Sequence, residues 1–338
     1  MKVAILSPTN PGSALILAQN LHERLQRIGV TSKLFNCHDL LRRLCPRADS
    51  GKKLHFHARQ KLQHLFLDQK TLNELSRFDA IVLADYIPTA FNPGYFGIEA
   101  LRSATNRPVY IYAVYSPHNA PSIESIIRTR FHTDPAQHFD GILHVANTTE
   151  IKGKPYPNSF HIGIESKAWK LSPQPLEKMK VLVDFEQPGH EDARHKQIQL
   201  LVNMDIDHIA LEGRYTIDEI RELYAQCSHY IIQSPEAFGL PICENLNLGL
   251  QILTQEAHWP MSWRIGMNIR SFEDGRLPDY FHVFHDNEGL RNILTQARDH
   301  HTISTAKEVR DRFTQDYSDY YHGVEQGLTQ WLDSINNH

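Results

Sequence analysis

Short apolar runs that alternate with helical segments are the feature that most constrains the fold of this chain. Between the apolar runs at residues 3–6 and 32–36, the apolar residues of segment 14–28 recur at spacings of three and four, which predicts a helix. Gly29 follows this segment and is typical of the end of a helix. Further helices are predicted at 54–75, 95–103 and 121–130. Alternating strands and helices predict a parallel, doubly wound α/β sheet. The strands are predicted at residues 3–6, 32–36, 79–83, 109–112, 141–145 and 159–164.

The same pattern restarts after residues 167–178, where Pro173 and Pro175 predict a linker. We therefore expect two α/β domains, with the cleft between them as the default ligand site. The last segment is amphipathic, contains Trp331 and is expected to pack back on the first domain. The predicted strands of the second half lie at 180–184, 208–211, 229–233 and 251–254, and its helices at 194–202, 217–227 and 241–248. The predicted parts are a first domain at 1–166, the linker, a second domain at 179–317 and a returning helix at 318–338.

Composition excludes several classes of protein. No apolar run reaches the roughly 20 residues that span a bilayer, and the opening run, residues 1–6, is shorter than a secretion signal requires. The four cysteines are scattered without a Cys-x-x-Cys pair, which argues against structural zinc and a disulfide framework. We expect a cytoplasmic protein without a transmembrane segment, and leave open an association with the inner face of a membrane.

The net charge of −4 conceals an uneven distribution. Residues 1–170 carry 21 lysines and arginines against 13 acidic residues, whereas residues 171–338 carry 14 against 26. A basic first half and an acidic second half suggest domains with different partners, although domains of this size also differ by chance.

The most informative stretch is residues 230–246, which follows a predicted buried strand. Glu236 and Glu244 stand eight positions apart, with Phe-Gly-Leu-Pro between them. Pro241 suits the first turn of a helix, and the helical amides that follow Gly239 would favour an anion. The stretch therefore predicts a strand, a tight turn and a helix whose N-terminus faces a negatively charged ligand.

This stretch resembles the E-x7-E motif of retaining GT-B glycosyltransferases, especially the GT4 group. Residues 215–224 resemble the segment that leads into this motif, whereas Asn245 departs from the usual alanine. The resemblance is strong over residues 207–254 and architectural elsewhere, and it implies the GT-B fold of two Rossmann-like domains facing a central cleft. The matching residues are Ser234, Glu236, Phe238, Gly239, Leu240, Pro241, Glu244 and Gly249.

The resemblance also implies roles for individual residues. Glu236 would face the transferred sugar, and His118, after a predicted strand of the first domain, would lie beside it as a second catalytic residue. Glu244 would bind the ribose hydroxyls, and the amides of Gly239 and Leu240 would meet the diphosphate. The full donor-binding set is Gly12, Ser13, Arg194, Lys196, Phe238, Gly239, Leu240 and Glu244. The family works without a metal, so we expect no metal site and no cofactor besides a nucleoside-diphosphate sugar, with UDP as the expected nucleotide.

The family's Gly-Arg pair is missing from the segment 183–196, where Arg194 and Lys196 are the remaining cations. Arginine is preferred for a bidentate phosphate contact, but both could also be solvated helix residues. Gly12 and Ser13 lie in a loop that could equally be a plain connection. The missing pair keeps open a rival from another class, a sugar-nucleotide-binding protein without catalytic activity.

A basic segment in the first half bears on the acceptor. Its charges could lie on an anionic membrane, contact the phosphates of DNA, or form a solvated face beside ordinary core. We expect a glycosyltransferase with an anionic acceptor, such as a glycolipid or polysaccharide at a membrane surface. The alternative is a phage-type glucosyltransferase that acts on modified DNA bases. The basic segment consists of Arg42, Arg43, Arg47, Lys52, Lys53, Arg59 and Lys61.

Overall fold

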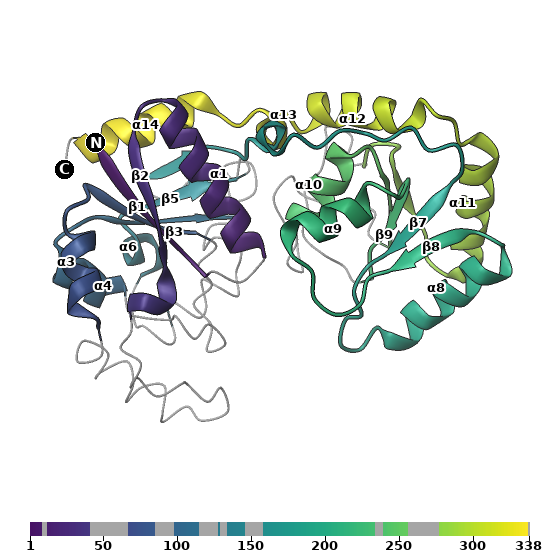
Figure 1. Ribbon diagram of the computed structural model, residues 1–338, viewed down its shortest axis with the longest axis horizontal. Coiled ribbons are helices and arrows are strands. Elements are labelled where there is room, and N and C mark those ends of the chain that lie inside the picture. Colours follow the sequence, from purple (N-terminus) through teal and green to yellow (C-terminus); the bar gives the residue numbers. More distant parts are fainter. Residues whose placement is uncertain are drawn as a thin grey trace. The chain divides into compact units, whose positions relative to one another are not determined.

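The computed structural model divides the chain into two compact units. Unit 1 comprises Met1–Ile164 together with Val324–His338, and unit 2 comprises Glu165–Gly323. Figure 1 traces the chain through both units. The structure describes residues 1–8, 12–40, 67–84, 98–114, 128, 134–145, 158–233, 239–255 and 277–336.

Unit 1 is built on a parallel sheet of six strands in the order β2-β1-β3-β4-β5-β6. Because β1 pairs with β2 on one side and with β3 on the other, the strand order reverses at β1. The gap between the ends of β1 and β3 is thus the topological switch point, where ligands of such sheets bind. The strands are β1 (Lys2–Ser7), β2 (Thr31–Asn36), β3 (Ala80–Ala84), β4 (Val109–Ala113), β5 (Gly141–His144) and β6 (Ser159–His161).

Helices cover both faces of this sheet. One core cluster joins Leu6, Leu83 and Ile111 of the strands to Leu72 of α3 and Leu101 of α4. Because side chains alternate along a strand, the intervening strand residues face the opposite layer. That layer is formed by α1 and α14 (Figure 1). The helices are α1 (Ser13–Arg27), η1 (Cys37–Leu40), α3 (Gln69–Leu75), α4 (Ile98–Thr105), α6 (Pro135–His138) and α14 (Glu325–Asn336).

The C-terminal helix α14 returns to unit 1, as predicted. Trp331 is fully buried, and its ring packs edge-on against Tyr110 of β4 at 5.7 Å between centroids. The Val324 amide donates to the Ile162 carbonyl at 2.9 Å. A Cβ on Gly327 would lie 1.8 Å from the His161 carbonyl oxygen, so the missing side chain permits the close approach of α14 to β6.

The prediction of one continuous helix over residues 54–75 is wrong at residues 67–68, which are not helical, whereas its predicted end at Leu75 is confirmed. In the described part of this range, helix α3 begins at Gln69. Asp68 has an extended backbone, and its side chain accepts a hydrogen bond from the Thr71 amide, which caps the helix. Residues 54–66 lie outside the described part of the chain.

Unit 2 contains a second parallel sheet, of five strands in the order β11-β10-β9-β7-β8. Here the switch point lies between β7 and β9, since β8 pairs with β7 on its other side. The strands are β7 (Lys180–Val183), β8 (Asp207–Ala210), β9 (His229–Ile231), β10 (Gln251–Thr254) and β11 (Phe281–Val283).

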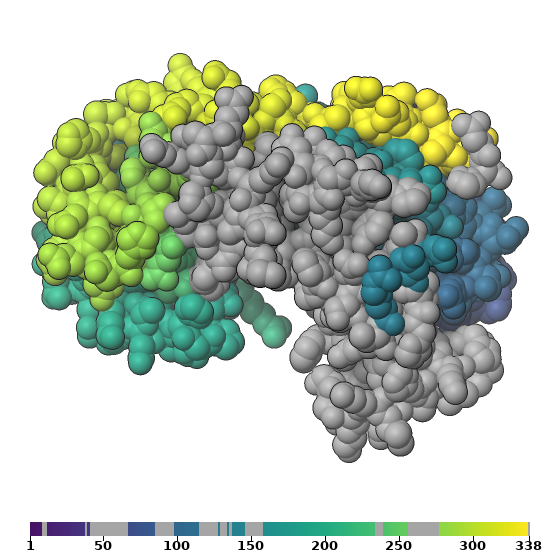
Figure 2. Space-filling model, turned by 180° about the vertical axis from the view of Figure 1, so that it is seen from behind, coloured from purple at the N-terminus to yellow at the C-terminus, as the bar shows by residue number. Residues whose placement is uncertain are grey.

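The helices of unit 2 also lie on both faces of their sheet. A core cluster joins Val181, Ile231 and Leu253 to Leu201 of α8 and Leu290 of α11, while α10 packs against α12. In Figure 2 the yellow-green side chains of the C-terminal helices cover much of the visible face of unit 2. Two doubly wound α/β units confirm the predicted fold class. The helices are η3 (Ser166–Trp169), α8 (Glu191–Asn203), α9 (Ile217–Tyr224), α10 (Leu240–Asn247), α11 (Asn287–His300), α12 (Thr305–Asp316) and α13 (Ser318–Tyr321).

Candidate functional site

The switch point of unit 2 lies where β7 and β9 end, and Asp184 and Gln233 follow these strand ends. The Asp184 amide donates to the Ile231 carbonyl at 3.1 Å, which joins the two strand ends. The Asp184 carboxyl is buried, and burial raises its pKa, while hydrogen bonds from Tyr230 and the Phe185 amide and the charge of Arg194 oppose this rise. Asp184 and Gln233, which follow the two strand ends, are thus both polar and largely buried.

Arg194 belongs to the framework of this edge. Its Nε donates to the Asp184 carbonyl at 2.9 Å and its Nη2 to the Leu211 carbonyl at 3.0 Å, so that it joins the loops after β7 and β8. The residue is only 6% exposed, whereas Lys196 on the same helix is exposed. Whether either cation contacts a diphosphate stays a prediction; the two hydrogen bonds of Arg194 lead to main-chain oxygens, and its Nη1 lies 3.9 Å from Oε1 of Glu212.

The predicted strand–turn–helix arrangement leads into α10. Gly239 is its N-cap with an extended backbone, no side chain of the described residues caps the helix, and Pro241 lies in the first turn as expected. The uncapped amides give the start of α10 the partial positive charge that a phosphate would favour. The donor role predicted for Gly239 and Leu240 is compatible with this geometry and remains a prediction.

Glu244 lies one turn into α10 and is 3% exposed. Nε and Nη2 of Arg221, on α9, each approach Glu244 Oε1 to 2.7 Å. Burial raises the pKa of Glu244, and the charge and hydrogen bonds of Arg221 oppose this rise. The sequence did not predict this ion pair, because 23 positions on two different helices separate its members.

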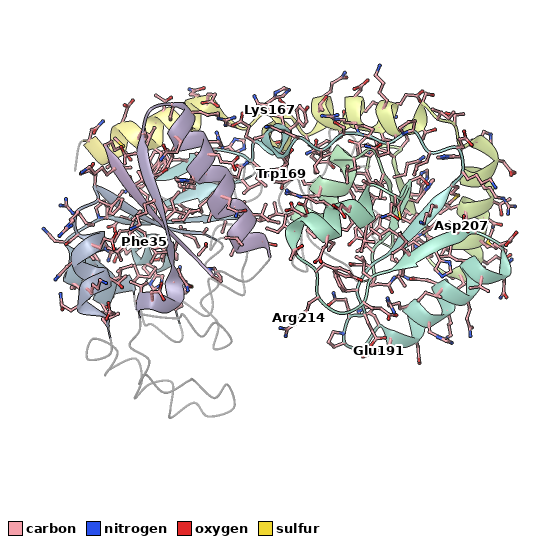
Figure 3. All side chains as sticks on the ribbon, in the orientation of Figure 1. Phe35, Lys167, Trp169, Glu191, Asp207 and Arg214 are labelled. Carbon is pink, nitrogen blue, oxygen red and sulfur yellow. The ribbon has the colours of Figure 1, made fainter. Side chains whose placement is uncertain are left out.

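Two aspartates, Asp205 and Asp207, lie at the start of β8. Asp207 begins β8, whereas Arg214 follows its carboxyl end, and Figure 3 shows the two far apart. Because Asp207 begins β8 and Asp205 precedes it, both lie at the edge opposite the strand ends, where both are exposed. The sequence Asp205-Ile206-Asp207 is a turn that leads into β8.

In unit 1, Gly12 is the N-cap of α1 and Ser13 is its first residue, after the end of β1. They lie near the switch point between β1 and β3, but their predicted contact with the donor stays a prediction. Several predicted site residues lie outside the described part of the chain: Glu236, His118, Phe238 and the basic segment, Arg42, Arg43, Arg47, Lys52, Lys53, Arg59 and Lys61.

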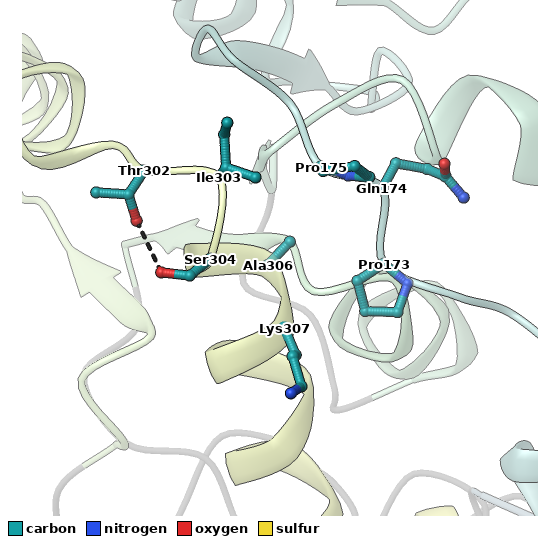
Figure 4. Close-up of a pocket in the computed structure, with 8 residues that line it drawn as sticks. All are labelled: Pro173, Gln174, Pro175, Thr302, Ile303, Ser304, Ala306 and Lys307. Atoms are coloured by element: carbon teal, nitrogen blue, oxygen red, sulfur yellow. Dashed lines mark hydrogen bonds between the residues drawn. The ribbon is translucent and has the colours of Figure 1, made fainter.

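A pocket of about 580 Å³ lies elsewhere in unit 2 (Figure 4). It is lined by the linker residues Pro173–Pro175 and by the start of α12. A Cβ on Gly249, just before β10, would lie 2.0 Å from the carbonyl oxygen of Ala306 in this lining, so the pocket lies near the amino ends of the strands. It is therefore separate from the switch point.

The described residues form neither a metal-binding cluster nor a membrane-spanning helix. No group of histidine, cysteine and acidic residues there is arranged to hold a metal ion. No helix in that part of the chain is both long and apolar enough to cross a membrane.

Comparisons with known proteins support the fold. No family model matches the chain, and no curated protein matches it. An alpha-glucosyltransferase in complex with UDP shares 10% identity at a TM-score of 0.54, over 99% of this chain and 100% of that one. The same enzyme with UDP and a 13-mer DNA containing an HMU base gives 0.55, with 10% identity over 99% of both chains. Phytolacca americana UGT2, complexed with UDP-2fluoro-glucose and pterostilbene, gives 0.53 at 10% identity, over 100% of this chain and 99% of that one. The predicted GT-B fold is thereby confirmed.

Proposed function

We propose that this protein is a glycosyltransferase that moves a sugar from a nucleoside-diphosphate sugar to an acceptor. The observation that carries the proposal is the buried Glu244, one turn into a helix that begins at Gly239 beside the strand ends of unit 2. It belongs to the motif that resembles the E-x7-E signature. The whole-chain likeness to UDP-bound glycosyltransferases supports the same assignment.

The donor binds unit 2 in this proposal. Glu244 accepts hydrogen bonds from the ribose, and the amides of Gly239 and Leu240 receive the diphosphate. Lys196 is the exposed cation of the predicted pair, and Gly12 and Ser13 lie toward the sugar. A UDP-sugar is the first candidate donor, because the structures with the same fold hold UDP or a UDP-sugar.

Catalysis is assigned to Glu236 and His118. Transfer breaks the bond between the anomeric carbon and the diphosphate oxygen, which keeps the electron pair, while an acceptor oxygen forms the new bond and loses its proton. Fixed donors at the diphosphate stabilise the leaving charge, and a carboxylate near the sugar stabilises the positive character of the anomeric carbon. We place Glu236 beside that carbon, with retention of configuration and without a metal. Near wild-type turnover in both Glu236→Gln and His118→Ala would contradict this placement.

The acceptor is proposed to be anionic and to engage the basic segment of the first half, as a glycolipid or polysaccharide at a membrane surface. A modified base in DNA is the second candidate, because a structure with the same fold was solved with such a DNA. Both fit an enzyme that works in the cytoplasm.

A thermal-shift panel with UDP-, GDP-, ADP- and TDP-sugars tests the donor assignment, since a ligand that binds only the folded state raises the melting temperature. We expect one donor to stand out, and Glu244→Ala to weaken its binding at least tenfold while the fold is kept. An unchanged Kd for the nucleoside diphosphate would refute the assignment. Binding without transfer or donor hydrolysis would instead favour the non-catalytic sugar-nucleotide-binding protein.

A further inference from the structure

Arg221 lies between a tryptophan ring and the buried carboxylate of Glu244. Its Nε and Nη2 both approach Oε1 of Glu244 to 2.7 Å, and its Cζ lies 5.2 Å from the centre of the Trp169 ring. The Arg221 side chain is 18% exposed and that of Glu244 is 4% exposed. Trp169 is the last residue of η3, near the start of unit 2, and is labelled in Figure 3. Its contact with Arg221 therefore links α9 to the first segment of unit 2.

Arg221 contacts only one of the two carboxylate oxygens of Glu244 in the described contacts. Both described hydrogen-bond donors meet Oε1, so within the described part of the chain Oε2 is left for another donor. An ionised carboxylate accepts hydrogen bonds at both oxygens, whereas a protonated one loses part of that capacity. A buried carboxylate also needs a positive partner to stay ionised, because burial alone favours the neutral form.

Among the described residues of the elements packed against Glu244, no second cation duplicates the role of Arg221. On α10 itself the titratable neighbour is Cys243, whose pKa is raised by burial. On η3 and its N-terminal side Lys167 pairs with Glu165 at 3.3 Å, and α13 contributes Asp319, which interacts with Cys243. The buried face of α12 is Val309 and Phe313, and β10 carries no ionisable side chain.

We propose that Arg221 is a positioning residue for nucleotide binding: it keeps Glu244 ionised and turned so that Oε2 meets the ribose hydroxyls, while Trp169 holds the guanidinium in place. This inference rests on the proposed function, because it takes Glu244 to be the ribose ligand. Arg221 itself does not touch the nucleotide. Its effect therefore depends on the hydroxyls that Glu244 binds and on the protonation of Glu244.

The test compares UDP with 2′,3′-dideoxy-UDP by titration calorimetry from pH 5.5 to pH 8.5. The wild type should bind UDP at least tenfold more tightly than the dideoxy analogue at pH 7. Arg221→Gln should reduce this ratio to about one at pH 7, since the two changes remove the same interaction. The pKa of Glu244 rises when Arg221 is removed, so the loss of UDP binding in acid should begin at a higher pH, and binding should recover toward pH 8.5.

Three further variants complete the test. Arg221→Lys keeps the charge without the planar fork, so it should keep the wild-type pH profile with weaker binding. Trp169→Ala should weaken UDP binding, with Trp169→Phe restoring most of it. The exposed Arg291→Gln on α11 is the matched control and should bind as the wild type does. If Arg221→Gln does not fold, Arg221→Lys and Trp169→Ala decide the question.

The outcomes separate the two claims. If the wild type binds UDP and discriminates against the dideoxy analogue, but the Arg221 and Trp169 variants keep the same ratio and pH profile, the positioning role is wrong. If Arg221→Gln weakens both nucleotides equally at every pH, Arg221 is merely structural and the proposal also fails. If the wild type binds no nucleoside diphosphate, the proposed function itself is wrong.

Discussion

His229, at the amino end of β9, is a buried titratable residue whose environment changes its pKa. Its side chain is fully buried, Nδ1 lies 2.9 Å from Ser228 Oγ, and the rings of His282 and His301 lie 6.4 Å from its own. Burial, with the two neighbouring histidines, lowers the pKa of His229 to about 3. The folded protein therefore holds this imidazole neutral where an unfolded chain would protonate it.

This pKa shift predicts a loss of stability in mild acid. Below the unfolded value near 6.5 the unfolded state binds the extra proton, so the free energy of unfolding falls as the pH drops from about 6.5 toward 3. One such histidine changes stability by up to ~1.4 kcal/mol per pH unit in that range. Buried His138 in unit 1, with a pKa lowered to about 4, adds to the effect.

Urea unfolding between pH 7.5 and pH 5 measures this dependence. His229→Asn should lower stability at pH 7.5 but flatten the decline toward pH 5, because the titrating group is gone. The exposed His300→Asn should change neither quantity. An equal slope in His229→Asn and the wild type would show that another group causes the acid sensitivity.

The sequence predicted single site residues only where a local pattern encodes them. Gly239, Pro241 and Glu244 follow from one short motif, and the structure places Pro241 and Glu244 in the predicted helix and Gly239 at its N-cap. Arg221 could not be predicted, because no spacing links it to Glu244. Arg194 was assigned by its charge, yet it belongs to the buried face of α8 together with Gln197 and Leu201. The helical spacing of Arg194, Gln197 and Leu201 was the sequence signal that Arg194 faces the interior and has a structural role.

Whole helices and strands were more predictable than their partners. Buried strands such as β10, at Gln251–Thr254, match the prediction because apolar runs in parallel sheets are continuous. Strand β11, at Phe281–Val283, was missed. The break at residues 67–68 within the predicted 54–75 helix was missed because Asp68 acts as a cap, and capping depends on backbone geometry as well as on residue type.

The docking of α14 on β6 gives a prediction at this scale. A Cβ on Gly327 would meet the backbone of His161, which cannot move like a flexible side chain. Gly327→Ala should therefore displace α14 and cost roughly 1–3 kcal/mol of stability, as in other overpacked sites. Gly289→Ala in α11, where the nearest atom lies 3.4 Å away, is the control. Thermal unfolding and limited proteolysis of the C-terminal segment would report the change, and a wild-type result for Gly327→Ala would contradict the proposed tight packing.

At the scale of the whole molecule, one chain forms two α/β units and returns to the first with its last helix. This could be predicted because the strand and helix pattern restarts after the proline-containing segment. The acceptor could not be predicted in the same way, because charge composition indicates the sign of a partner and not its identity. The uneven charge distribution nevertheless supports a test of the intact protein.

We predict that charge reversal in the basic segment impairs acceptor use and spares donor binding. Exposed charges act over about 8 Å at physiological salt, so several must attract an anionic acceptor together. Replacing Lys52, Lys53, Arg59 and Lys61 by glutamate should raise the acceptor KM several-fold and leave the Kd of the donor unchanged. Added salt should likewise weaken acceptor use more than donor binding.

The matched control reverses four exposed cations of unit 2 and makes the same change in net charge: Lys170, Lys178, Arg291 and Lys307. It should leave the acceptor KM near the wild-type value. Binding to anionic liposomes and to duplex DNA, measured side by side, then separates a membrane acceptor from a nucleic-acid acceptor, because only the true surface should lose binding in the basic-segment variant. If neither surface binds and the basic-segment variant keeps its acceptor kinetics, these charges form a solvated face, and a small neutral acceptor becomes the better hypothesis.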